Sequence, residues 1–260
     1  YISRSNKKSD TKMKKLLSVL FILLCINTLF AEQIYLLSDG HTFFHFSDDF
    51  SEYKFTNLDS YGNFSNTSKI IKKENNKISV WLFNNEKYVY FSAKDYFILA
   101  NKTGDLTFIK DYSDYWIENR EIITTPEASS FKKENSVRYD EFNLLYIDFN
   151  PWITDSDNSG INESVIIKSD KSFNQFRIIN GYVDIDNSDL FEKYNRVKVI
   201  KTYDENGNLI GEYQIEDNSS IQYFKLPTSY NYVKFEISEI YDGTEYDDVA
   251  VTALQMYTHR

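Results

Sequence analysis

Short runs of alternating apolar and polar residues, separated by polar turns, follow one another along most of the chain. Alternation with a period of two is typical of half-buried β-strands. In the first half, residues that favour tight hairpin turns separate such runs at Asn84-Asn85 and Gly104-Asp105. The strands predicted there are 34–37, 42–46, 53–58, 77–83, 87–93, 96–101 and 106–111. We expect residues 32–125 to form a small antiparallel β-domain, whose role the pattern does not reveal.

The same pattern resumes in the second half. A strong hairpin signal lies at Asp204–Asn208, which contains Asn206-Gly207. The strands predicted there are 143–149, 164–168, 175–180, 196–203, 209–215, 221–225, 232–241 and 249–257. Short strands with turn signals between them favour a jelly-roll β-sandwich. The predicted fold class is therefore all-β, with the sandwich preceded by the small β-domain.

The alternation fails between residues 115 and 131, which places a domain boundary in this stretch. Pro126 disfavours both a helix and a central strand, because proline lacks the backbone N–H that either would use. We predict the sandwich domain to span residues 126–260.

The segment that begins at Met13 resembles a secretory signal peptide. Lys14 and Lys15 precede an apolar run, 16–26, and Ala31 provides a small residue at the expected cleavage site. The run is too short for a transmembrane helix, so we expect no membrane span after cleavage. Residues 1–12 precede the only plausible start methionine and are expected to be a non-native leader. The predicted location is secreted or periplasmic.

Charge and cysteine content exclude several classes of function. The formal net charge is −10, and residues 1–31 carry six basic side chains and one acid, so their removal changes the net charge to −15. Nucleic acids need clustered basic charge, which makes them poor partners for so acidic a chain. Cys25 lies within the apolar run. We therefore expect no disulfide, thiolate chemistry or cysteine-bound zinc in the exported chain, and no cofactor.

A set of short motifs in the second half resembles the discoidin-like, galactose-binding-like domain that accompanies a bacterial NAD-glycohydrolase toxin. The resemblance covers about half the chain, from about Glu127 to Tyr257, and does not extend to the first half. The motifs are Ala128-Ser129-Ser130-Phe131, Asn143-Leu144, Pro151-Trp152, Gly160-Ile161 with Glu163, Asn180-Gly181-Tyr182, Tyr194-Asn195-Arg196-Val197-Lys198 and Tyr246-Asp247-Asp248-Val249-Ala250-Val251.

The resemblance implies a glycan-binding module with any catalysis elsewhere. Asn162 replaces a glycine of the family's turn, which asparagine tolerates if the backbone is left-handed there. Domains of this wider fold often hold a structural calcium ligated by an acid on the final strand. That strand reads Val251-Thr252-Ala253-Leu254 in this chain, so no metal is expected.

Aromatic faces cover the apolar side of a sugar ring, while amides, carboxylates and guanidinium groups bind its hydroxyls. Each residue taken alone is more simply explained as part of the fold: Trp152 as a core side chain, and Arg196 as a buried partner of Asp247 or Glu163. The binding hypothesis therefore rests on the set. The candidate ligand-binding residues are Trp152, Glu163, Asn180, Tyr182, Asn195, Arg196, Tyr246 and Asp247.

Other chemistry has little support. The turn Asp155–Gly160 resembles half of a calcium-binding loop, but Ile166 stands where its bidentate glutamate belongs, so a solvated acidic turn is expected. His41 and His45 would share a strand face without a third zinc ligand, and a partly solvated face explains them better.

Three functions remain open. The first is a secreted or periplasmic, non-catalytic carbohydrate-binding protein, and the second is a protein-interaction or envelope-structural module with no sugar ligand. The third is a hydrolase with carboxylates of the first domain as acid and base, although no catalytic motif supports it.

Overall fold

The computed structural model describes residues 32–37, 42–57, 65–66, 68–75, 78–93, 96–110, 120–121, 124–147 and 149–258. Strands dominate these ranges, which confirms the all-β prediction. The predicted leader, the signal peptide and His41 lie outside the described residues. No helix within those ranges is long and apolar enough to cross a membrane.

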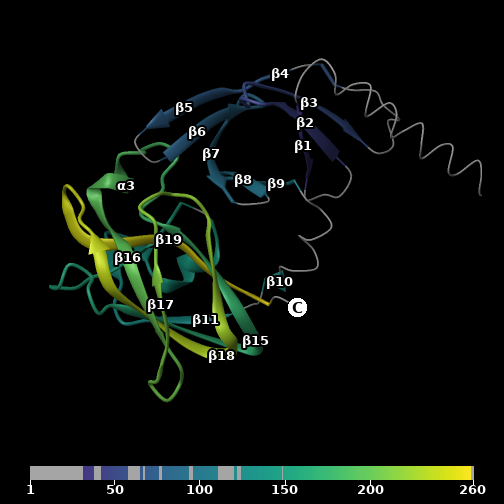
Figure 1. Ribbon diagram of the computed structural model, residues 1–260. Coiled ribbons are helices and arrows are strands. Elements are labelled where there is room, and N and C mark those ends of the chain that lie inside the picture. Colours follow the sequence, from purple (N-terminus) through teal and green to yellow (C-terminus); the bar gives the residue numbers. More distant parts are fainter. Residues whose placement is uncertain are drawn as a thin grey trace, which may run out of the picture.

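The first part of the chain forms one antiparallel sheet that closes on itself (Figure 1). Its order is β4-β3-β2-β1-β9-β8-β7-β6-β5, so β4 and β5 stand at the two ends although only Ile70 separates them in sequence. The segment from β4 to β5 therefore joins both ends and makes a barrel. The strands are β1 Glu32–Leu37, β2 Thr42–Ser47, β3 Glu52–Asn57, β4 Ser68–Lys69, β5 Ile71–Asn75, β6 Ile78–Phe83, β7 Glu86–Ser92, β8 Tyr96–Asn101 and β9 Gly104–Ile109.

The predicted hairpin turn at Asn84-Asn85 is confirmed. Both residues have positive φ, 50° and 64°, as a two-residue turn between twisted antiparallel strands requires. Strands β4 and β5 were not predicted, because Lys69, Lys72 and Lys73 break the apolar alternation of this closing segment.

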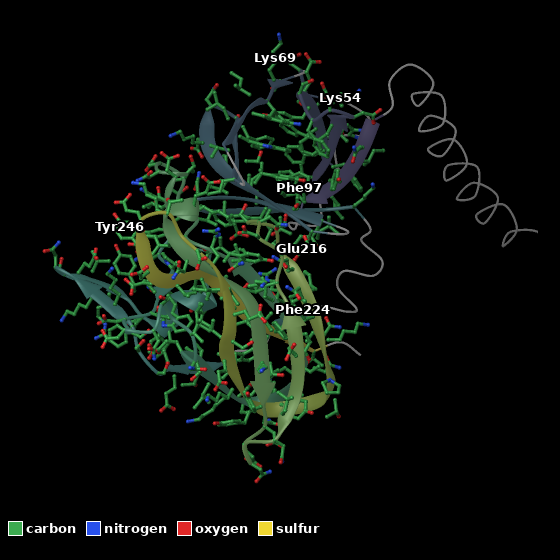
Figure 2. All side chains as sticks on the ribbon, turned by 60° about the vertical axis from the view of Figure 1, so that its left-hand side comes forward. Lys54, Lys69, Phe97, Glu216, Phe224 and Tyr246 are labelled. Carbon is green, nitrogen blue, oxygen red and sulfur yellow. The ribbon has the colours of Figure 1, made fainter. Side chains whose placement is uncertain are left out.

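Alternate residues of the central barrel strands face two different cores. Phe97 and Leu99 of β8 point into the barrel interior, whereas Ile98 and Ala100 point outward. The interior is filled by aromatic rings, among them Tyr53 of β3 stacked at 4.5 Å on Phe83 of β6, which brings the two ends of the sheet together. Figure 2 shows Phe97 in the part of the barrel that lies nearest the sandwich.

The rest of the chain forms the predicted sandwich around a second core that contains Trp152 and Val165. Two pairs of predicted strands each proved to be one long strand, β15 and β18, which bend at register shifts instead of ending. The strands are β10 Arg120–Glu121, β11 Thr125–Ala128, β12 Lys132–Glu134, β13 Val137–Tyr139, β14 Trp152–Ile153, β15 Ser164–Asn180, β16 Tyr194–Tyr203, β17 Leu209–Gln214, β18 Gln222–Tyr241 and β19 Tyr246–Thr258. Two short helices, η2 Glu141–Leu145 and α3 Leu190–Lys193, lie between them.

Pro126 lies within β11, a strand that pairs only with β15, so the expectation that proline avoids a central strand holds. Two other expectations from the sequence are wrong. None of the described residues in the predicted strand 143–149 lies in a strand, and the helix η2 covers the first of them. His45 is not on a partly solvated face, since it is only 6% exposed in β2. The predicted boundary between residues 125 and 126 stays a prediction.

Barrel and sandwich share a third core, to which both contribute fully buried side chains, for example Phe91 of β7 and Ile179 of β15. A backbone hydrogen bond from Ile221 to Ser92 crosses the same interface. At its centre lies the buried guanidinium of Arg177, which donates to the hydroxyl of Tyr96 of the barrel at 3.0 Å.

The remaining partners of Arg177 come from the sandwich. Its Nη1 also donates to the Tyr223 hydroxyl at 3.4 Å, its Nε donates to Gln255 Oε1 at 2.7 Å, and its guanidinium carbon lies 5.0 Å from the centre of the Tyr257 ring. Burial raises the pKa of Tyr96 despite the nearby positive charge, so its hydroxyl stays protonated. The two parts are thus joined by both apolar packing and a buried polar contact.

We expect Tyr96→Phe to lower the free energy of unfolding by about 2 kcal/mol, because it removes a buried hydrogen bond to a charged group. Chemical denaturation followed by tryptophan fluorescence measures this. Tyr88→Phe is the matched control, since the Tyr88 hydroxyl donates to Glu86, an exposed acid, and should lose less than about 1 kcal/mol. Equal losses in the two variants would contradict the role of the Arg177 contact.

We expect part of the barrel's stability to vanish in acid. Asp49 accepts hydrogen bonds from the Ser47 hydroxyl and the Ser51 backbone, which lower its pKa to about 2. A pKa that is lower in the folded than in the unfolded state stabilises the fold at pH values above the unfolded-state pKa of about 4. This stabilisation is lost as the pH falls towards 2. Asp49→Asn should therefore destabilise the chain at pH 6 and not at pH 2. A stability difference that does not change with pH would contradict this.

Candidate functional site

Four tyrosines form a row at one end of the sandwich, and we call them the tyrosine row. Tyr139 lies 6.2 Å from Tyr182, Tyr182 lies 5.4 Å from Tyr194, and Tyr194 is stacked on Tyr246 at 4.4 Å, measured between ring centres. Figure 2 shows Tyr246 at the rim of the molecule. Among the described residues, the ring of Tyr246 contacts no ring other than Tyr194, so Tyr246 ends the row at the surface.

The buried members of the row are neutral phenols. Burial raises the pKa of Tyr194 to about 12 even though the positive charge of Lys132 works in the opposite direction. Burial also raises the pKa of Tyr182. The pKa of the half-buried Tyr246 is raised mainly by its interaction with the neighbouring carboxylate of Glu245. The row therefore presents uncharged rings at neutral pH.

Lys132 of β12 lies at the edge of the stacked pair. Its Nζ is 5.8 Å from the centre of the Tyr194 ring and 5.7 Å from that of Tyr246, so it stands beside the stack and does not lie over the outer face of Tyr246. The same Nζ forms ion pairs with Asp248 at 2.7 Å and Glu134 at 3.2 Å. Burial works against the charge of Lys132, but the two carboxylates outweigh it and raise its pKa.

Asn195 connects the loops that carry the outer end of the row. Its Nδ2 donates to the carbonyl oxygens of Asp247 at 2.6 Å and Ser159 at 3.2 Å, and its Oδ1 accepts from the Gly243 N–H at 2.6 Å. Gly243 is required there, because a Cβ would collide with the backbone of Lys193. Asn195 as a whole is only 3% exposed. Its carboxamide therefore holds the loops together and does not face a ligand.

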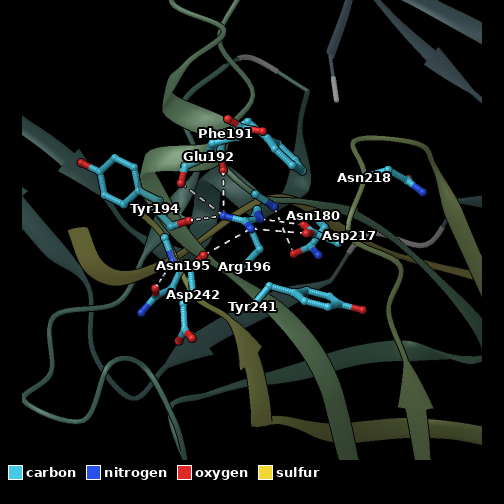
Figure 3. A network of polar contacts seen from close by, with 12 residues as sticks. Asn180, Phe191, Glu192, Tyr194, Asn195, Arg196, Asp217, Asn218, Tyr241 and Asp242 are labelled. Carbon is cyan, nitrogen blue, oxygen red and sulfur yellow. Dashed lines mark hydrogen bonds and ion pairs between the residues drawn. The ribbon is translucent and has the colours of Figure 1, made fainter. Parts of the chain in front are cut away.

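Arg196 is buried in a polar network (Figure 3). Its Nε and Nη2 donate to the two carboxylate oxygens of Asp217 at 2.7 and 3.3 Å. The predicted partners, Asp247 and Glu163, are therefore wrong; the loop that follows Ile215 supplies the acid instead. The guanidinium also donates to the carbonyl oxygens of Phe191, Glu192, Tyr194 and Asp242.

Three further candidates serve the fold. Trp152 is 3% exposed and donates from Nε1 to the Ser130 carbonyl at 2.9 Å. Asn180 is fully buried, where it donates to the Val197 carbonyl at 2.8 Å and accepts from the Val197 N–H at 3.0 Å. The carboxylate of Glu163 accepts hydrogen bonds from the hydroxyls of Ser129 and Ser130.

The structure thus places five of the eight predicted residues around the tyrosine row but exposes few of them. Tyr182, Asn195 and Arg196 are buried there, whereas Tyr246 is half-buried and Asp247 is exposed. The binding roles of the eight candidates remain predictions, and only Tyr246 and Asp247 present groups to solvent without first being used by the fold. The sequence analysis did not select three residues that lie beside Tyr246, namely Tyr194, Lys132 and Asp248. Tyr194 and Asp248 lie within the family motifs, whereas no local sequence signal marks Lys132.

The backbone at Asn162 is left-handed, with φ of 69°, which is the condition under which asparagine can replace the family's glycine. The acidic turn before it also has the expected form, since Asp155 and Asp157 are exposed. Within the described part of the chain, no three His, Cys, Asp or Glu side chains are grouped so that they could hold a metal ion.

The sandwich, its buried Asn180 and Arg196, and its motif-bearing loops define a discoidin-like domain. Residues 115–257 match the family model described as the NAD glycohydrolase translocation F5/8 type C domain. This match covers more than half of the chain, so the chain belongs to that family. A comparison with curated proteins found no match.

Solved structures similar to this chain include carbohydrate-binding domains from Clostridium perfringens. The CBM32-1 and CBM32-2 domains of ZmpB in complex with GalNAc are 12% identical, with a TM-score of 0.40, and the match covers 57% of this chain and 36% of that one. This chain thus spans about a third of that protein's length. The domain CpGH89CBM32-5 in complex with GalNAc-β-1,3-galactose is 15% identical, with a TM-score of 0.36 and coverage of 52% and 95%.

The family 32 domain of NanJ in complex with galactose is also 15% identical. Its TM-score is 0.35, and the match covers 52% of this chain and 93% of that one.

Proposed function

We propose that this chain is an exported, non-catalytic binding protein whose sandwich recognises carbohydrate at the tyrosine row. The single observation that supports this most is the outer face of Tyr246, a half-buried ring that ends the row at the surface. A flat ring of this kind suits the apolar C–H face of a pyranose. Membership of a family of F5/8 type C domains is consistent with a binding role.

Polar groups beside the ring supply the hydrogen bonds that a sugar needs. The Lys132 ammonium and the carboxylates of Asp248 and Glu134 stand at the edge of the Tyr194–Tyr246 stack. Ammonium groups donate and carboxylates accept, so together they can bind neighbouring hydroxyls of one ring.

We expect Tyr246→Ala to weaken sugar binding about tenfold, because it removes the stacking ring. A glycan array identifies a ligand, and calorimetry then gives the dissociation constants. Tyr246→Phe is the matched control: it keeps the ring, loses only the hydroxyl, and should bind nearly as well as the parent. Absence of any saccharide ligand, or an unchanged affinity in Tyr246→Ala, would refute the proposed function.

Export rests on the basic and apolar segment between Met13 and Ala31. Mass spectrometry of the chain recovered from outside the cytoplasm should find an N-terminus at Glu32. An intact N-terminus in the recovered chain would contradict export through a cleaved signal.

A second candidate function is a module that binds an envelope protein. Three large apolar side chains between residues 137 and 146 are exposed: Val137 by 40%, Phe142 by 52% and Tyr146 by 65%. Exposed aromatic residues are common where proteins bind one another. A partner that is captured from envelope extracts, resists competing sugar and is lost in Phe142→Ser would favour this function over carbohydrate binding.

A further inference from the structure

Two Asn-Gly pairs occur in the sequence, Asn180-Gly181 and Asn206-Gly207. An asparagine before glycine is reactive, because the backbone nitrogen of the glycine can attack the side-chain carbonyl carbon of the asparagine and no Cβ hinders the approach. The reaction needs a side chain that is free to turn toward the following nitrogen. The structure gives the two pairs opposite surroundings.

Asn180-Gly181 is fixed inside the sandwich. Asn180 is 0% exposed, its Nδ2 donates to the Val197 carbonyl at 2.8 Å, and its Oδ1 accepts from the Gly181 N–H at 3.1 Å. A Cβ on Gly181 would lie 2.5 Å from the Phe191 ring, so the backbone is tightly enclosed there. Neither the carboxamide nor the glycine nitrogen is available for reaction.

Asn206-Gly207 lies in the turn that joins β16 to β17, and both residues are exposed. The backbone N–H of Asn206 donates to Asp204 Oδ1 at 2.9 Å, but its carboxamide forms no hydrogen bond with any described residue. No atom outside the adjoining residues lies within 4 Å of the place where a Cβ on Gly207 would stand. The Asn206 side chain can therefore rotate, and the glycine nitrogen can be approached.

One hydrogen bond opposes the reaction. The Gly207 N–H donates to the Asp204 carbonyl at 3.0 Å, and this bond must open before the nitrogen can attack. It lies in an exposed turn, where water replaces it at a small net cost. The Asp204 carboxylate also accepts from the N–H groups of Asn206 and Asn208, and these bonds hold the backbone of the turn but leave the Asn206 side chain free.

We propose that Asn206 deamidates spontaneously in the folded chain, whereas Asn180 does not. The Gly207 nitrogen gives up its proton to hydroxide and bonds to Cγ of Asn206, the bond from Cγ to Nδ2 breaks, and the nitrogen leaves as ammonia with a proton from water. A water molecule then opens the resulting cyclic imide at either carbonyl. The products are aspartate and isoaspartate, in which the backbone runs through Cγ, and the net reaction exchanges water for ammonia.

The modification changes the turn in two ways. Either product places a new negative charge beside Asp204 and Glu205. Isoaspartate also lengthens the backbone by one carbon atom, which displaces Gly207 from the Asp204 carbonyl and loosens the start of β17. Asn206 follows the opposite end of β16 from Tyr194, so the tyrosine row should keep its structure.

Incubation of the full chain at mildly alkaline pH, followed by mass spectrometry of its proteolytic peptides, tests the inference. We expect Asn206 to react about fivefold more slowly in the folded chain than in guanidinium chloride, because the Gly207 hydrogen bond must open first. In the folded chain Asn180 should react at least about a hundredfold more slowly than Asn206, since its reaction requires the sandwich core to open. The two asparagines should react at similar rates in guanidinium chloride.

Asn206→Gln is the matched variant, because glutamine keeps the carboxamide but would have to close a larger ring. This variant should lose the mass change in the peptide that contains the turn, and it should no longer be labelled by a methyltransferase specific for isoaspartate.

An Asn206 that stays intact in the folded chain but reacts in guanidinium chloride would overturn the inference. Equal rates for Asn206 and Asn180 in the folded chain would also overturn it, because the structure would then not distinguish the two pairs. Neither measurement involves a sugar, so failure of this inference leaves the proposed function standing.

Discussion

Replacing Arg196 by methionine is expected to lower the free energy of unfolding by about 3 kcal/mol. The substitution leaves the carboxylate of Asp217 without its buried partner, and breaking a buried pair by removing one member has a cost of this size. It also removes the donor that the guanidinium provides to the carbonyl oxygens at the end of α3. The Arg196 side chain is only 6% exposed, so the site is shielded from solvent and the loss is costly. Urea denaturation followed by circular dichroism measures the loss.

The matched control is Lys198→Met, two residues along the same strand. Lys198 also forms an ion pair at 2.7 Å, with Glu239, but both side chains are more than a third exposed. An exposed pair contributes less than about 1 kcal/mol, so this variant should remain close to the parent. If Arg196→Met lost no more than Lys198→Met, the network around Arg196 would not be a main support of the sandwich.

Trp152→Ala should destabilise the chain by about 3–5 kcal/mol, which is typical of removing a buried aromatic side chain from a core. Trp152 lies in the sandwich core with Val165 and Val251, and its indole N–H donates to Ser130. The same substitution should leave the dissociation constant for a sugar unchanged under conditions where the variant is folded, because Trp152 is buried away from solvent. Thermal melts and calorimetry separate the two effects.

Two controls sharpen this experiment. Trp152→Phe keeps most of the volume and loses the hydrogen bond to Ser130, so a loss of about 1–2 kcal/mol is expected. Tyr146→Ala removes an aromatic ring that is 65% exposed and should change stability by less than about 0.5 kcal/mol. A stable Trp152→Ala variant with weakened sugar binding would restore Trp152 as a ligand contact.

Much of the fold followed from local pattern. In strands such as β8, the period-two alternation reflects that successive residues face two different cores. The turn at Asn84-Asn85 follows from the positive φ angles that asparagine tolerates. Closure of the barrel was not predictable, because β4 and β5 are short and rich in lysine. Their pairing depends on strands that are far away in sequence.

The candidate site was predicted less well than the fold. Residues such as Trp152 and Asn180 are characteristic of the family's motifs, but a motif does not indicate whether a side chain points into the core or out of it. Lys132 belongs to a hairpin that was not predicted and meets Asp248 across more than 100 residues of sequence. Only the packed structure shows that Lys132 and Tyr246 share one end of the sandwich.

The sequence by itself determined the all-β class, the position of most strands and the acidity of the chain, because each of these depends on neighbouring residues or on composition. The tertiary structure decided which motif residues are consumed by the fold and which remain at the surface. The physical reason is that a buried polar group must find partners inside the protein. Arg196 and Asn195 found theirs in distant loops, whereas Tyr246 and Asp247 were left facing solvent.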